Sequence, residues 1–164
     1  MQRLIAGLAA AAALAVSASP ASAAGPADPI GELVQNLEAV GSAALKAPEL
    51  LMKATLYHSG VKGVGVRDSL GCRVQPMRTL AVDPKVLPRH SVVYIPATVG
   101  LPLPGGGVHD GIWYASDTGG AIKGKRIDLY AGASAAAMRG LSKLNLKTLA
   151  VMRISSFDGC PPSS

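Results

Sequence analysis

The spacing of apolar residues divides the chain into an N-terminal helical part and a longer part of short strands. From residue 30 the apolar positions follow helical spacing, at Ile30, Leu33, Val34, Leu37, Val40, Ala44 and Leu45. Asp28 can cap this helix, with Pro29 at its first position. The pattern therefore predicts one amphipathic helix that ends before Pro48.

After Met52 the pattern changes to short apolar runs separated by Gly, Pro and Asp. Six of these runs are predicted to be strands, at residues 55–57, 79–82, 92–95, 112–116, 126–130 and 148–154. One short helix is predicted between Ser134 as its cap and Gly140 as its terminator. Two long loops, 59–77 and 96–109, are of the kind that carries function. Six short strands and one small helix favour a mainly β fold, a closed barrel.

The first residues have the pattern of a cleavable signal peptide at 1–23. Arg3 supplies the positive charge, and Ala21-Ser22-Ala23 fits the cleavage site. The uncharged run between them is shorter than the roughly 20 residues of a membrane-spanning helix, which disfavours a permanent anchor. We therefore expect a secreted or periplasmic chain without stable membrane insertion, with a helical lead-in at 24–53 and one domain at 54–160.

Cysteine count and charge narrow the possible chemistry. Cys72 and Cys160 predict a disulfide in an exported chain, and a catalytic thiol is the alternative. The formal charge of +6 favours an anionic polymer such as the bacterial envelope as partner. The Lys and Arg residues are scattered and aromatic residues are few, which disfavours nucleic acid.

The segment 117–128, with the sequence DTGGAIKGKRID, holds the densest candidate chemistry. The preceding strand would bring Asp117 to its end, and the double glycine after Thr118 lets the backbone approach a ligand closely. Alternation on the next strand places Ile127 and Leu129 in the core and Asp128 toward a groove. Two neighbouring carboxyls push their pKa values apart, so that one can serve as a general acid.

Each aspartate also has a purely structural interpretation, which stays open at this point. Asp117 could be a turn residue that accepts backbone hydrogen bonds, and Asp83, before Pro84, could cap a turn. Asp128 is harder to explain in this way, because aspartate is disfavoured inside strands. A solvent-exposed strand face would still accommodate it.

Asp83, Asp117 and Asp128 resemble the three aspartates for which the 3D domain family is named. The matching segments are AVDPKVLP at 81–88 and DTGGAIKGKRIDLY at 117–130, and the resemblance extends over about 54–154. It implies a six-stranded double-psi β-barrel related to the catalytic domain of membrane-bound lytic transglycosylase A.

The resemblance also implies a reaction and a site. The substrate would be peptidoglycan glycan, cleaved between N-acetylmuramic acid and N-acetylglucosamine with formation of a 1,6-anhydro end and without a cofactor. Asp128 would be the first choice for the acid/base, Asp117 would tune or substitute for it, and Asp83 would support the loop or the floor of the site. The substrate would contact Thr118, Gly119, Gly120 and Lys123.

Other functions remain open alongside this one. Larger transglycosylases carry a second domain for which this chain has no room, so a non-catalytic glycan-binding module on the same barrel is the main alternative. Asp117-Thr118-Gly119 is also the triplet of aspartic proteases, but Gly120 follows it here instead of Ser or Ala. No metal site is predicted, because the three histidines are far apart and lack ligand spacing. His58 and His109 flank the long loops, where either could line a groove, but a surface position is expected. Of the neighbours Trp113 and Tyr114, only one can face a sugar.

Overall fold

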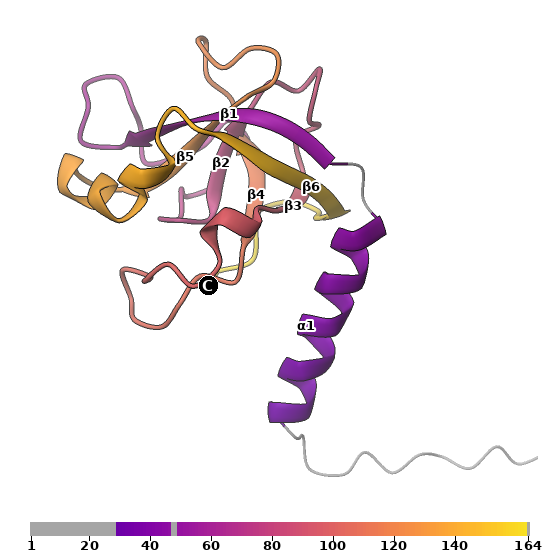
Figure 1. Ribbon diagram of the computed structural model, residues 1–164. Coiled ribbons are helices and arrows are strands. Elements are labelled where there is room, and N and C mark those ends of the chain that lie inside the picture. Colours follow the sequence, from indigo (N-terminus) through magenta and orange to yellow (C-terminus); the bar gives the residue numbers. More distant parts are fainter. Residues whose placement is uncertain (1–28, 47–48, 164) are drawn as a thin grey trace, which may run out of the picture.

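The computed structural model describes residues 29–46 and 49–163, so the predicted signal peptide lies outside the described residues. Its elements in chain order are α1 (Pro29–Lys46), β1 (Glu49–His58), β2 (Thr79–Val82), β3 (Ser91–Tyr94), η1 (Pro96–Thr98), β4 (Ile112–Asp117), β5 (Arg126–Gly132), η2 (Ala135–Leu144) and β6 (Thr148–Ser156). The strands close into one barrel in the order β1-β5-β2-β4-β3-β6 (Figure 1). This confirms the predicted mainly β, six-stranded barrel.

The barrel mixes parallel and antiparallel pairs. β1 runs parallel to β5, and β2 runs parallel to β4, whereas the other neighbouring pairs are antiparallel. β2 lies between β4 and β5, the two strands that carry Asp117 and Asp128. The topology thus brings the two ends of the 117–128 segment to opposite sides of one short strand.

The core is mainly aliphatic, and the aromatic side chains of Trp113 and Tyr130 are also buried. Trp113 is fully buried, whereas its neighbour Tyr114 is half-buried, so only one of the two points outward as alternation predicted. Ile127 and Leu129 are both fully buried, and Asp128 between them is not. The predicted facing of this strand is therefore confirmed.

Two elements differ from the sequence-based prediction. β1 begins at Glu49 instead of residue 55, with Met52 and Ala54 alternating into the core, so residues 49–53 form part of the barrel and not of the lead-in. η2 is a 3-10 helix that continues through Gly140 to Leu144, and within the described part of the chain the Ser134 side chain makes no capping bond. Leu141 explains the continuation, because it follows the glycine directly and is completely buried.

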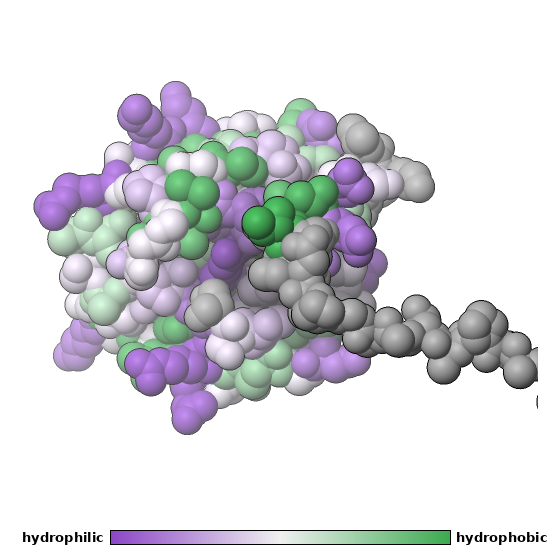
Figure 2. All heavy atoms as spheres, turned by 90° about the horizontal axis from the view of Figure 1, so that it is seen from below, coloured by the Kyte–Doolittle hydropathy of each residue, from purple (hydrophilic) through white to green (hydrophobic). Residues whose placement is uncertain are grey.

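α1 projects from one side of the barrel and ends close to the start of β1 (Figure 1). Its apolar side chains Ile30, Val34 and Leu37 are exposed, and apolar surface is visible on this side of the molecule in Figure 2. In the described part of the chain, no helix combines the length and apolar character needed to cross a membrane.

The predicted disulfide joins Cys72 to Cys160, with the two Cα atoms 5.6 Å apart. Cys72 belongs to a short hairpin, residues 66–74, in which Asp68 donates its backbone N–H to Cys72 and Val74 donates to Val66. The bridge therefore fixes this hairpin to the C-terminal segment after β6.

Candidate functional site

The two aspartates of the 117–128 segment lie on either side of Ala81. Asp117, the last residue of β4, is opposite Ala81 in the parallel pair, and Asp128 of β5 is opposite the same alanine in the antiparallel pair. Because neighbouring strands are about 4.8 Å apart, the Cα atoms of the two aspartates are about 10 Å apart. The single methyl group of Ala81 leaves space between the two carboxyl groups.

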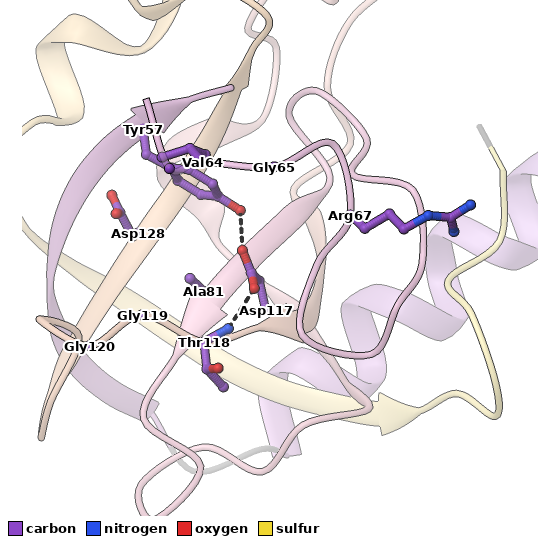
Figure 3. Close-up of a pocket in the computed structure, with 11 residues that line it drawn as sticks. Tyr57, Val64, Gly65, Arg67, Ala81, Asp117, Thr118, Gly119, Gly120 and Asp128 are labelled. Carbon is purple, nitrogen blue, oxygen red and sulfur yellow. Dashed lines mark hydrogen bonds between the residues drawn. The ribbon is translucent and has the colours of Figure 1, made fainter. Parts of the chain in front are cut away.

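Both carboxyl groups line one pocket of about 390 Å³ (Figure 3). β1 contributes Tyr57 to its wall, and β2 contributes Ala81. The loops complete the lining with Gly63, Val64, Gly65, Arg67, Thr118, Gly119 and Gly120. The long loop after β1 thus forms one lip of the pocket, and the glycine turn after β4 forms another.

Asp117 is held by three hydrogen-bond donors. The Tyr57 hydroxyl donates to Oδ2 at 2.8 Å, and the backbone N–H groups of Ser69 and Thr118 donate to Oδ1 at 3.0 and 2.8 Å. Burial, followed by the charge of Asp117, raises the pKa of Tyr57, so its hydroxyl remains a donor. Asp117 is therefore an oriented carboxylate, and the bond from Ser69 ties the hairpin 66–74 to the pocket.

Asp128 has few partners by comparison. Its Oδ1 is buried and has no hydrogen-bond partner among the described residues. Burial raises the pKa of Asp128, and the charge of Asp117 adds to the rise, while Thr55 and Arg126 oppose it. A half-buried carboxyl with a raised pKa and a free oxygen can hold a proton and donate it into the pocket.

Asp83 lies outside the pocket lining, at the turn after β2. Its side chain accepts hydrogen bonds from the backbone N–H of Gly124 at 2.7 Å and of Lys85 at 3.0 Å. These two bonds, with Gly124 first, lower the pKa of Asp83. It therefore anchors the 117–128 loop through Gly124.

Among the predicted substrate-binding residues, three line the pocket and one does not. Thr118, Gly119 and Gly120 belong to the lining. Lys123 is exposed and absent from it, and its charge acts on Asp83 instead. The glycine turn faces the pocket, whereas the lysine side of the loop faces solvent.

Sequence reasoning did not identify Tyr57, Ala81 or Arg67 as site residues. Tyr57 precedes His58 at the start of a long loop, which was the one signal available for it. Ala81 belongs to the AVDP motif, but nothing local shows that it separates two aspartates. Arg67 sits in a loop whose path depends on the disulfide.

The expectation of a surface position for His109 was wrong. His109 is fully buried, stacks on Trp113 at a ring-centroid distance of 5.0 Å, and donates from Nε2 to the Met77 carbonyl at 2.6 Å. This tautomer follows because Nδ1 accepts from the Gly111 backbone N–H at 2.8 Å. Burial lowers its pKa, so it serves the core as a neutral packing residue.

Comparison with known families supports the resemblance. Residues 78–150 match the family model of the 3D domain. The match includes Asp83, Asp117 and Asp128, and it confirms the relation to 3D domains inferred from the two motifs.

Several solved structures are similar to the chain. The lytic transglycosylase LtgG of Burkholderia pseudomallei is 26% identical with a TM-score of 0.37, covering 52% of this chain and 24% of its own. The crystal structure of MltA from Escherichia coli is 20% identical with a TM-score of 0.42, covering 59% and 29%. MltA of E. coli with bound chitohexaose is 20% identical with a TM-score of 0.41, covering 55% and 28%. This chain matches about a quarter of the length of these structures, and no curated protein matches it.

Proposed function

Because the chain carries a 3D domain, we propose that it is a secreted lytic transglycosylase-like enzyme that cleaves peptidoglycan glycan. The bond broken is the one between N-acetylmuramic acid and N-acetylglucosamine, and the product is a 1,6-anhydro end. One observation carries the proposal: two carboxyls share a pocket, and they differ in their partners. Asp117 accepts three hydrogen bonds, whereas Asp128 has a raised pKa and an oxygen without a partner among the residues that the structure describes.

Asp128 is the acid and then the base in this proposal. Its carboxyl donates a proton to the glycosidic oxygen, and the N-acetylglucosamine leaves with that proton as its new hydroxyl. The C6 hydroxyl of the muramic acid then attacks its own anomeric carbon, and the Asp128 carboxylate takes up the proton that this hydroxyl loses. Asp128 both donates and takes up the proton, so the reaction consumes no water. A second catalytic carboxylate is therefore not required, whereas hydrolytic glycosidases use two.

Asp117 supports this cycle electrostatically. It is one strand beyond Ala81 on the far side of the pocket, and its negative charge raises the pKa of Asp128. A fixed negative charge also stabilises the positive charge that develops on the sugar ring as the glycosidic bond breaks. Tyr57 and the Ser69 N–H hold the carboxylate in place for that purpose.

The decisive experiment is digestion of purified peptidoglycan with the chain lacking residues 1–23, followed by mass spectrometry of the soluble products. We expect 1,6-anhydro muropeptides from the wild type and none from Asp128→Asn. Asp158→Asn is the matched control, because Asp158 is exposed and distant in sequence from the pocket residues.

The products discriminate between the possible functions. Reducing-end muropeptides in place of anhydro ends would indicate hydrolysis and contradict the transglycosylase mechanism. Intact glycan that retains the protein would leave a non-catalytic glycan-binding module on the same barrel. Secretion is tested separately, by determining whether the N-terminus of the exported protein begins at Ala24.

A further inference from the structure

Two arginines face each other on the hairpin 66–74 beside the pocket. Arg67 and Arg73 form an antiparallel bridge. The flanking backbone bonds join Val74 to Val66 and Asp68 to Cys72, which makes the arginines a non-hydrogen-bonded pair. In such a pair the Cα atoms are about 4.5 Å apart and the two side chains project to the same face.

This pair of like charges has no anionic partner within the described part of the chain. Neither arginine forms a salt bridge there. The nearest acidic residue in sequence, Asp68, accepts from the backbone N–H groups of Leu70 and Cys72 through Oδ1. Arg67 donates to the Gly71 carbonyl at 2.7 Å, which orients its guanidinium but leaves the charge uncompensated. Like charges directly opposite each other destabilise a strand pair, so an anionic ligand bound by both arginines would relieve their repulsion.

The arginine pair borders the aspartate pocket. Arg67 lines that pocket, and together with Arg73 and Val66 it lines a smaller hollow next to it. The Ser69 N–H bonds to Asp117, and Arg67 is two residues away in the same hairpin. Figure 3 shows the Arg67 side chain pointing away from the two aspartates. The positive charge therefore lies to one side of the reaction centre.

We propose that Arg67 and Arg73 form a subsite for the carboxylates of the peptide stems on the glycan, which makes the enzyme prefer stem-bearing strands. This inference rests on the proposed function. A peptide stem leaves the muramic acid ring sideways and carries carboxylates several ångströms from the cleaved bond. A guanidinium pair matches this chemistry, because its planar donors bind carboxylates in a bidentate manner. Both arginines are exposed, so they can meet such a ligand without rearrangement.

The test measures binding of soluble glycan strands in an Asp128→Asn background, in which cleavage does not deplete the ligand. Strands with native stems are compared with the same strands after their carboxylates have been converted to amides. We expect Arg67→Gln with Arg73→Gln to weaken binding of native strands roughly threefold to tenfold at low salt. Amidation of the strands is expected to weaken binding to the parent protein by a similar factor. Combining both changes is expected to add nothing further, because they remove the same contact.

The matched control is Arg139→Gln with Lys143→Gln, which removes the same charge from the exposed face of η2. An equal loss in this control would show that net charge attracts the strand, and it would overturn the subsite. The subsite is also overturned if the arginine variant binds native strands as tightly as its parent. The subsite is likewise overturned if the arginine variant loses the same affinity for amidated strands as for native strands. It is also overturned if a phosphate polymer competes with the strands for binding while the stem carboxylates have no effect on affinity. Absence of binding by any strand would instead refute the proposed function itself.

Discussion

Breaking the disulfide between Cys72 and Cys160 is expected to cost the fold a large part of its stability. The bridge spans a sequence separation of 88 residues. A loop of this length constrains the unfolded chain by about 4.6 kcal/mol at 25 °C in the chain-entropy model. A domain of this size typically has about 5–15 kcal/mol of stability, so the reduced protein is expected to be marginal. The corresponding fall in melting temperature is roughly 15–20 °C.

The assay is urea unfolding of the oxidised protein, of the same protein reduced with dithiothreitol, and of Cys72→Ala with Cys160→Ala. The reduced wild type keeps both sulfur atoms, so its difference from the oxidised form isolates the cross-link. The double alanine variant adds a packing loss, because Cys72 is 4% exposed. We expect the urea dependence of the unfolding free energy to increase in both uncross-linked forms, since their unfolded chains expose more surface.

A loss below about 1 kcal/mol on reduction would refute this reasoning, because chain entropy would then contribute little. Such a result would indicate that the hairpin 66–74 is held by its other contacts. The candidates are the Ser69 bonds to the Asp117 carboxylate and to the Ser116 carbonyl. Tyrosine fluorescence of the pocket residue Tyr57 in a background without the other tyrosines would then report whether the hairpin stays in place.

Three further changes test the site and the core. Asp128→Asn is expected to be more stable than the wild type at neutral pH, because burial raises the folded-state pKa of Asp128. The contribution of this carboxyl to wild-type stability is fully present below its unfolded-state pKa of about 4 and is lost as the pH rises through its folded-state pKa. Urea unfolding from pH 3 to 8 should show this gain growing with pH, and a gain that is equal at all pH values would contradict it. Tyr57→Phe removes one of three donors to Asp117 and is expected to slow glycan cleavage about tenfold, with a loss of unfolding free energy of about 1 kcal/mol; an unchanged rate would exclude a positioning role. Gly111→Ala is expected to destabilise the fold by about 1–3 kcal/mol in thermal melts, because Gly111 has a φ of +89° and an added Cβ would collide with the Tyr94 ring; an unchanged melting temperature would show that the ring can move aside.

Much of the fold could be predicted from the sequence because its signals are local. Period-two alternation around Asp128 placed Ile127 and Leu129 in the core, and both are fully buried. Two cysteines in a chain with the pattern of a signal peptide were sufficient to predict the disulfide. By contrast, β1 was predicted too short, because Glu49 follows Pro48 directly after a helical pattern and has no strand signal of its own.

The site was only partly predictable because its geometry depends on contacts between distant segments. Asp117 and Asp128 were identified from one continuous motif, and both line the pocket. Tyr57 reaches Asp117 across 60 positions of the chain, and this bond exists only because β1 pairs with β5 in the closed barrel. From the sequence His109 appears at the end of a loop, but in the structure it stacks on Trp113 and donates a hydrogen bond to the Met77 carbonyl.

The strand order explains why one short motif can supply two different carboxyl groups. β2 separates β4 from β5, so the chain must cross β2 between Asp117 and Asp128, and the glycine turn makes that crossing. Asp117 then lies near backbone donors at a strand end, whereas Asp128 lies within a strand, where the ladder occupies the backbone N–H groups. The difference in partners therefore follows from position along the strand. Asp83 completes the arrangement by fixing Gly124 in the crossing segment. A barrel with this topology thus produces one held carboxylate and one protonatable carboxyl from a single short motif.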